Sequence, residues 1–232
     1  MKLLCIECSA SPASAAVTEN GEIISSAFVN IKITHSQTLM TLVDSVLDSA
    51  FLTLSDIDGF AVSAGPGSFT GIRIGISALK GMAEAENKPC FAVSTLRAIA
   101  ENITHENTII NAVMDARCNQ YYNALFLRKD GKLKRLTEDR ALLHDELADQ
   151  LKKFCEEYGC GYITAGDGAD LFASREKCVV AHESVKFQTA SAVGITAYSD
   201  NIEPTDCAAL TPVYLRLPQA ERELKRKKEE KL

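Results

Sequence analysis

The sequence predicts an α/β fold made of two halves that begin in the same way. Residues 2–8 and 108–114 are both strand-like apolar runs with a carboxylate at their end, Glu7 in the first and Asp115 in the second. Each run is followed by further strand-like segments joined by turns, and then by amphipathic helices that alternate with short apolar strands. With 46% hydrophobic residues among 232, the chain can give each half its own core.

Charge and cysteine content argue against several classes of protein. A net charge of −6 provides no overall positive field for a phosphate backbone, so we expect any RNA to be held through a partner. The N-terminus is apolar only briefly before Glu7, which suits neither a secretory signal nor a membrane span and predicts a cytoplasmic protein without membrane association. The eight cysteines are scattered, and neither closely spaced pair has the context of a redox or zinc site, so they predict reduced thiols.

Residues 1–104 are expected to form the first half. Asn20-Gly21 is a strong signal for a two-residue hairpin, and apolar residues at three- and four-residue spacing predict a helix that Ser36 caps. Ser94 or Thr95 should cap a later helix. The elements expected in this half are strands at 2–8, 15–19, 22–31, 59–64 and 90–93, and helices at 36–51, 70–86 and 95–103.

Residues 105–217 are expected to form a second half in a similar order. Its expected elements are strands at 108–114, 120–127, 133–136, 161–165 and 177–180, and helices at 144–158 and 189–199. Residues 218–232 are a charged run with almost nothing to bury, which predicts a mobile or weakly helical tail. Tandem halves of this design resemble the actin, Hsp70 and sugar-kinase superfamily, so we predict an actin-like duplicated fold.

The two hairpin turns carry little of what a nucleotide site needs. Actin-like ATPases hold phosphates in these turns, where glycine lets the backbone approach the ligand. Here the turns read SASPAS at 9–14 and ARCN at 116–119, without glycine. Glu7 and Asp115 could hold a hydrated magnesium ion, or they could simply be strand-end acids bonded to turn amides, which the missing glycines favour. We therefore predict at most a vestigial nucleotide site formed by Glu7, Ser9 and Asp115.

Residues 63–75, SAGPGSFTGIRIG, form the most distinctive segment. It lacks the lysine of a Walker A loop, and Phe69 stands where a nucleophile elbow needs serine. Two interpretations remain open, an anion site at the start of a helix and a tight turn that only lets the helix pack closely. Gly166-Asp167-Gly168 is likewise either the remnant of a nucleotide-binding turn or simply a turn.

The helix over 70–86 carries two nonpolar stripes, and two stripes imply two neighbours. One neighbour is the sheet. The other stripe, which is lined by small residues, allows close approach of a helix, either the 36–51 helix of this chain or one from a partner. We predict a partner interface here, and a homodimer through the same face is the alternative when the partner is missing. The predicted interface residues are Leu39, Met40, Val43, Leu47, Gly71, Arg73, Gly75, Ala78 and Met82.

The histidines argue against a metal enzyme. No two of His35, His105, His144 and His182 lie four residues apart, so no helix offers paired imidazole ligands. We predict no metal site and no catalytic residue.

Four motifs, in this order and spacing, resemble the TsaB (YeaZ) family. They are GPGSFTGIRIG at 65–75, VSTL at 93–96, MDAR at 114–117 followed by Tyr121 and Tyr122, and PVYLR at 212–216. The resemblance covers residues 1–217. It implies an actin-like paralogue of TsaD, the subunit that carries a His-x-x-x-His metal site and transfers the threonylcarbamoyl group to a tRNA adenosine.

The resemblance also implies partners and a role. The chain would be a non-catalytic scaffold that forms a heterodimer with TsaD and a ternary complex with the ATPase TsaE, and it would meet tRNA only through that complex. It would have no cofactor of its own, with ATP and magnesium only in the complex. A single histidine at His35 and Glu7 in place of the usual aspartate fit loss of the active site. The alternative is an actin-like ATPase or kinase, or a peptidase, that acts on its own.

Overall fold

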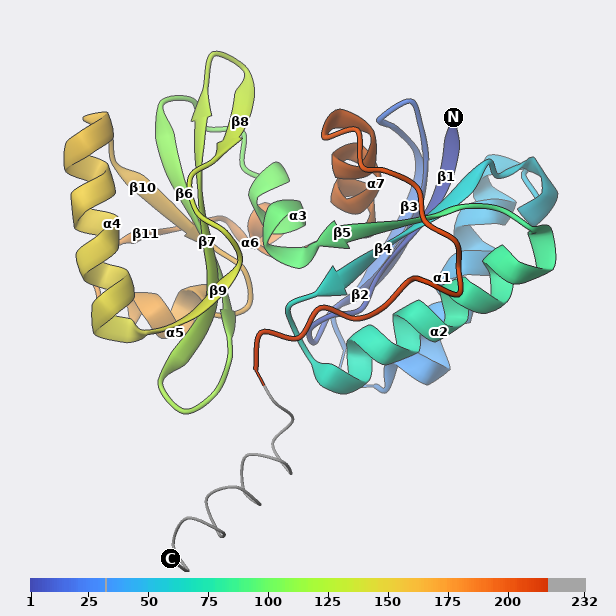
Figure 1. The fold of residues 1–232 in the computed structure, drawn as a ribbon, viewed down its shortest axis with the longest axis horizontal. Coiled ribbons are helices and arrows are strands. Elements are labelled where there is room, and N and C mark those ends of the chain that lie inside the picture. The colour runs from blue at the N-terminus through green and yellow to red at the C-terminus, as the bar shows by residue number, and fades with distance from the viewer. Residues whose placement is uncertain (32, 217–232) are drawn as a thin grey trace, which may run out of the picture.

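The structure, a computed structural model, describes residues 1–31 and 33–216 and confirms the predicted α/β actin-like fold. Two sheets stand side by side, and helices pack on both faces of each (Figure 1). The predicted tail at 218–232 lies outside the described residues. Within the described part of the chain, no helix is long and apolar enough to cross a membrane.

The first sheet has the strand order β3-β2-β1-β4-β5. Its elements are β1 (Lys2–Glu7), β2 (Ala13–Glu19), β3 (Glu22–Val29), α1 (His35–Ala50), the 3-10 helix η1 (Leu54–Asp56), β4 (Gly59–Gly65), α2 (Phe69–Glu86), β5 (Cys90–Ser94) and α3 (Thr95–Glu101). The first three strands are antiparallel, and β4 and β5 then extend the sheet in parallel. All strands and helices predicted in this half are confirmed, but α1 begins one residue before Ser36 and has Thr34 as its N-cap.

The second sheet has the order β11-β10-β6-β7-β8, and β9 also pairs with β7. The elements are β6 (Thr108–Asp115), β7 (Gln120–Lys129), β8 (Lys132–Arg135), β9 (Arg140–Leu143), α4 (His144–Tyr158), β10 (Tyr162–Ala165), α5 (Ala169–Ala173), β11 (Val179–Val180), α6 (Glu183–Lys186) and α7 (Ala190–Ser199). The sequence missed β9, α5 and α6. Each is only four or five residues long, too short to show a period.

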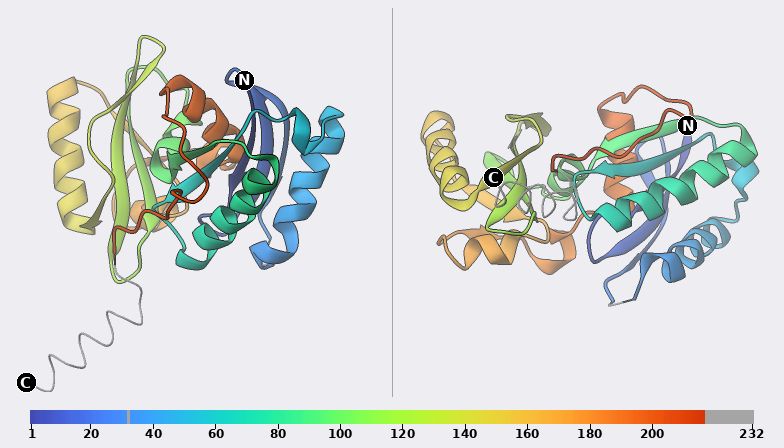
Figure 2. Two further views of the ribbon diagram at one scale, coloured as in Figure 1. Left: turned by 45° about the vertical axis from the view of Figure 1, so that its right-hand side comes forward. Right: turned by 60° about the horizontal axis from the view of Figure 1, so that its bottom comes forward.

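The first sheet is covered on both faces. Helices α1 and α2 lie side by side on one face, and α7 lies on the opposite face (Figures 1 and 2). Gly194 of α7 allows this close approach, since a Cβ there would lie 2.5 Å from Thr18 Oγ1. The helix fits because the residues it buries are small.

The chain returns to the first half at its end. We expected residues 105–217 to belong together, but α7 and the segment after it pack along the first sheet. The amide of Thr205 donates to Cys90 O at 2.8 Å, and that of Val213 donates to Ala64 O at 2.7 Å. Small apolar residues of α7 complete a face of the first sheet that would otherwise be bare.

Candidate functional site

The ends of the two leading strands, β1 and β6, lie where the halves are in contact. Glu7 closes β1 and is completely buried, and its Oε1 accepts hydrogen bonds from Ser9 N and Ser9 Oγ, both at 2.6 Å. Burial raises the pKa of Glu7 above its ordinary value, while Ser63 and Ser9 partly offset this. Glu7 Oε1 is therefore bonded to the turn that follows its own strand, while Oε2 is buried without a hydrogen-bond partner in the part of the chain that the structure describes.

The second half contributes two further acids. Asp115 Oδ1 accepts from Arg117 N at 2.7 Å, the strand-end role that was one of its two interpretations. The structure brings Asp167 beside it, and burial, followed by the charge of Asp115, raises the pKa of Asp167 to about 6. Asp167 Oδ1 is buried without a hydrogen-bond partner among the described residues. Sequence reasoning noticed the Gly-Asp-Gly turn but did not place its acid in the site.

The contact between the halves does not fit the phosphates of a nucleotide. Ala10 of the first turn lies in the same hydrophobic cluster as Ala112 and Met114 of β6. The glycine-rich turn is also packed tightly onto the first turn, since a Cβ at Gly67 would lie 2.4 Å from Ser9 O. Apolar packing thus joins the first turn to β6, and both hairpin turns lack the glycines needed for close backbone approach to phosphate.

His35 contacts the backbone of the first hairpin turn. Its Nε2 lies 2.7 Å from Ala10 O, and Leu39, one helical turn later, is buried in the core. In the described ranges, no group of three or more His, Cys, Asp or Glu side chains could hold a metal ion.

The small-residue stripe of α2 faces this chain's own sheet. A Cβ at Gly71 would lie 2.1 Å from Cys8 O, and one at Gly75 would lie 2.7 Å from Cys8 Sγ. The Cys8 thiol donates to Gly71 O at 3.1 Å. The close neighbour that the glycines indicated is therefore the end of β1, and not a partner helix.

Most of the predicted interface residues are accordingly unavailable to a partner. Those buried in the core of the first half are Leu39, Val43, Leu47, Gly71, Gly75 and Met82. Met40 and Arg73 remain exposed, and Ala78 is half-buried. The reason is geometric, because both nonpolar stripes of α2 pack within the chain. Their neighbours are β1 and β4 of the first sheet and helix α1.

The outer side of α2 carries an ordered cluster of aromatic and basic side chains. The Arg73 guanidinium lies 3.9 Å from the centroid of the Phe69 ring, and Arg73 Nε donates to Tyr214 Oη at 2.7 Å. Phe69 and Tyr214 stack with their centroids 4.8 Å apart. A shallow hollow beside them is lined by Phe69, Thr70, Arg73, Ile74 and Ser77. We call Phe69, Arg73, Ile74, Ser77 and Tyr214 the outer α2 face.

Only Arg73 of this face was predicted from the sequence. Phe69 and Tyr214 belong to motifs that were noticed, but 141 positions separate Arg73 from Tyr214. Nothing local in the sequence shows that the returning C-terminal segment crosses α2.

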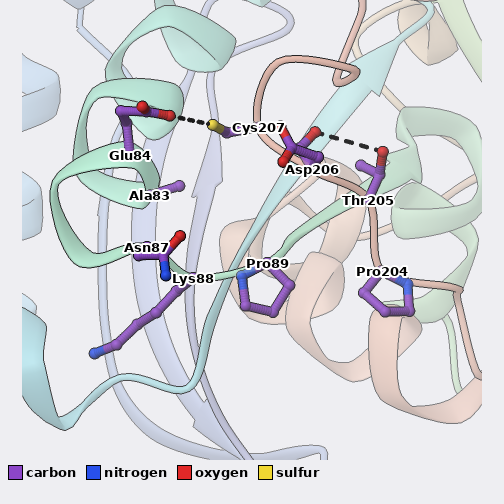
Figure 3. A pocket seen from close by; sticks show the side chains of 9 residues that line it. All are labelled: Ala83, Glu84, Asn87, Lys88, Pro89, Pro204, Thr205, Asp206 and Cys207. Carbon is purple, nitrogen blue, oxygen red and sulfur yellow. Dashed lines mark hydrogen bonds between the residues drawn. The ribbon is translucent and has the colours of Figure 1, made fainter.

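A second pocket lies where that segment passes the end of α2 (Figure 3). Its lining residues are Ala83, Glu84, Asn87, Lys88, Pro89, Pro204, Thr205, Asp206 and Cys207. The Cys207 thiol donates to Glu84 Oε2 at 2.8 Å, and this bond raises the pKa of the thiol. An acceptor that favours the protonated thiol makes Cys207 a poor nucleophile, so the pocket offers no evident chemistry.

Known proteins resemble this chain over nearly its whole length. Residues 24–221 match the model of the family TsaD: tRNA N6-adenosine threonylcarbamoyltransferase. The chain is 29% identical over 235 residues to the tRNA threonylcarbamoyladenosine biosynthesis protein TsaB of Bacillus subtilis, covering 95% of this chain and 96% of that one. It is 30% identical over 171 residues to the Escherichia coli protein of the same name, covering 72% of each.

Solved structures agree with this assignment. YeaZ from Pseudomonas aeruginosa superposes with a TM-score of 0.78 at 26% identity, covering 92% of this chain and 99% of that one. The ethanolamine utilization protein EutJ from Carboxydothermus hydrogenoformans, with a TM-score of 0.51 at 10% identity over 84% of this chain and 89% of its own, shares the fold. The chain therefore belongs to the TsaB family of tRNA threonylcarbamoyladenosine biosynthesis proteins, within the broader TsaD family that the model describes.

Proposed function

We propose that this chain is a non-catalytic subunit that supports tRNA threonylcarbamoylation by binding TsaD through the outer α2 face. Family membership gives the pathway, threonylcarbamoyladenosine biosynthesis. The observation that carries the finer proposal is the surface cluster of Arg73, Phe69 and Tyr214. Arginine and aromatic side chains are the residues that most often dominate binding energy, and these three already hold one another in place.

The strand ends at the contact between the halves support a role without chemistry. Glu7 is fully buried, with Oε1 bonded to its own turn, so it presents no exposed oxygen to a hydrated magnesium ion. Ala10 and Met114 fill the contact between the halves with apolar side chains. On this proposal ATP and magnesium act only in the complex, and the chain has no cofactor of its own.

Symmetry of fold supports TsaD as the partner. Because this chain matches the TsaD family model over most of its length, TsaD should present an equivalent pair of helices on its own first sheet. Two related helix layers can pack in an approximately two-fold arrangement. A second copy of this chain would occupy the same face when TsaD is absent. TsaE would join the TsaD heterodimer, and a net charge of −6 leaves tRNA to the other subunits.

Calorimetric titration of purified TsaD into this chain tests the interface. Arg73→Glu should raise Kd at least about tenfold, because charge reversal removes the cation from over Phe69 and its bond to Tyr214. Lys177→Glu, a reversal of the same sign at an exposed position of the second half, is the matched control and should leave Kd unchanged. Equal affinity for both variants and wild type would place the interface elsewhere.

A further inference from the structure

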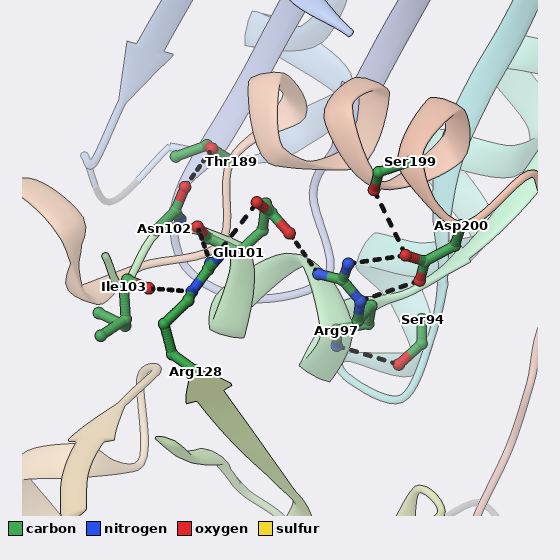
Figure 4. A network of polar contacts seen from close by, with 9 residues as sticks. All are labelled: Ser94, Arg97, Glu101, Asn102, Ile103, Arg128, Thr189, Ser199 and Asp200. Carbon is green, nitrogen blue, oxygen red and sulfur yellow. Dashed lines mark hydrogen bonds and ion pairs between the residues drawn. The ribbon is translucent and has the colours of Figure 1, made fainter. Parts of the chain in front are cut away.

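We infer that an ion-pair network with a buried centre locks the two halves of this protein at one angle. The network joins Arg97 and Glu101 of α3, Arg128 of β7 and Asp200 at the end of α7 (Figure 4). We call these four residues the interhalf lock. The inference does not depend on the proposed partner.

The Glu101 carboxylate lies between two guanidinium groups that belong to different parts of the fold. Arg97 Nη1 donates to Glu101 Oε2 at 2.5 Å, and Arg128 Nη2 lies 3.6 Å from Glu101 Oε1. Arg97 also donates to both carboxylate oxygens of Asp200, from Nε at 2.9 Å and from Nη2 at 2.7 Å. One chain of charges thus connects α7 on the first sheet, α3 between the sheets and β7 in the second sheet (Figures 1 and 4).

Arg128 also fastens the end of the connecting helix to the second sheet. Its Nε donates to Ile103 O at 3.1 Å, and its Nη2 donates to Glu101 O at 3.2 Å. Carbonyls at a helix end have no partner within the helix. Helix α3 connects β5 of the first sheet to β6 of the second, so it forms the first crossing of the chain between the halves. The bonds from Arg128 hold this crossing against the second sheet.

The second crossing, between α6 and α7, is tied to the same place. Asn102 Nδ2 donates to Phe187 O at 2.7 Å, and Thr189 Oγ1 donates to Asn102 Oδ1 at 3.4 Å. Rotation of one half against the other would have to move the two crossings relative to each other. The bonds between the crossings oppose that movement.

Burial makes this network specific to one geometry. The side chains of Arg97, Arg128 and Glu101 are only 7%, 10% and 16% exposed. A buried charge that loses its partner is strongly destabilising, so other angles between the halves, which would part these groups, are disfavoured. The lock therefore keeps the first hairpin turn packed against the second half, with Glu7 buried beneath it.

Hydrogen exchange measured by mass spectrometry on the full-length chain tests the inference. Glu101→Gln keeps the shape of the side chain but removes its charge. Amides at 102–107, 183–189 and the turn at 9–12 should exchange at least about tenfold faster, because two charge-assisted contacts are weakened at once. Small-angle scattering should show a larger radius of gyration.

Two further variants decide what the result means. Asp170→Asn is the matched control, because it removes a carboxylate 2.8 Å from the buried Lys186 within the second half. Since Lys186 itself lies in 183–189, this variant is read at 102–107 and at the turn at 9–12, where exchange should stay unchanged. Arg128→Lys retains the charge but cannot form all three contacts, so it should produce the Glu101→Gln pattern more weakly. If both lock variants leave exchange unchanged, or speed it only within α3, the ion pairs stabilise that helix alone and do not fix the angle between the halves. Either result overturns the inference.

Discussion

Gly75 and Arg73 lie two residues apart on α2, yet they serve different regions of the molecule. Gly75 belongs to a buried side, where α2 meets the end of β1 and where a single added carbon would approach Cys8 Sγ to 2.7 Å. Arg73 belongs to the exposed outer α2 face. The contrast teaches that a stripe of small residues indicates close packing but does not identify the neighbour. An ordered cation–aromatic cluster at the surface, by contrast, indicates a candidate binding surface.

Filling the buried side should cause the largest loss of stability. Gly75→Leu places a side chain where even a Cβ is too close to Cys8, so we expect the free energy of unfolding to fall by about 3 kcal/mol or more. Urea unfolding followed by circular dichroism measures this. Gly81→Leu on the same helix is the matched control. No heavy atom lies within 4 Å of that Cβ position, and the change should be neutral or stabilising by up to about 1 kcal/mol. Full stability of the Gly75→Leu protein would mean that the stripe faces outward.

Asp167, whose Oδ1 is buried where the halves are in contact, should give stability a pH dependence of intermediate size. The folded state raises the pKa of Asp167 to about 6, so folded protein holds this proton more tightly than unfolded chain does. The stabilisation is complete below the unfolded pKa, about 4, and is lost as pH rises through the folded pKa of about 6; two pKa units correspond to about 3 kcal/mol. Asp167→Asn should flatten this part of the curve, measured by urea unfolding from pH 4 to 7. Glu7 and Asp115 lie close to Asp167 and are present in both proteins. An identical slope in the variant would contradict the assignment.

Trimming the exposed face should have the smallest effect on stability. Arg73→Ala removes a surface hydrogen bond and an exposed cation–aromatic contact, each of which contributes about 1 kcal/mol or less. Thermal melting checks this prediction. A loss as large as that of Gly75→Leu would show that the outer face is part of the core and not a binding surface.

Regular patterns allowed most of the fold to be predicted. The Asn20-Gly21 hairpin, the helical spacing of α1 and the capping of α3, where Ser94 Oγ accepts from Arg97 N, are local signals, and the structure confirms them. The candidate site was harder, because it depends on contacts between distant residues. The proximity of Asp167 to Asp115, the contact of Tyr214 with Arg73 and the inward orientation of Gly75 are all set by tertiary packing. For the same reason, the charges of Arg97, Glu101 and Arg128 appeared ordinary in the sequence.

The most direct measurement is the yield of threonylcarbamoyladenosine in tRNA incubated with TsaD, TsaE, ATP, magnesium and a threonylcarbamoyl donor. Omission of this chain should abolish the product. Asp115→Asn, at the end of β6, should retain the yield within about twofold, while Arg73→Glu, on the outer α2 face, should lower it at least about tenfold. The chain alone should not hydrolyse ATP. If Asp115→Asn abolishes the product and Arg73→Glu does not lower it, the strand-end acids perform chemistry and the account of a binding subunit is wrong.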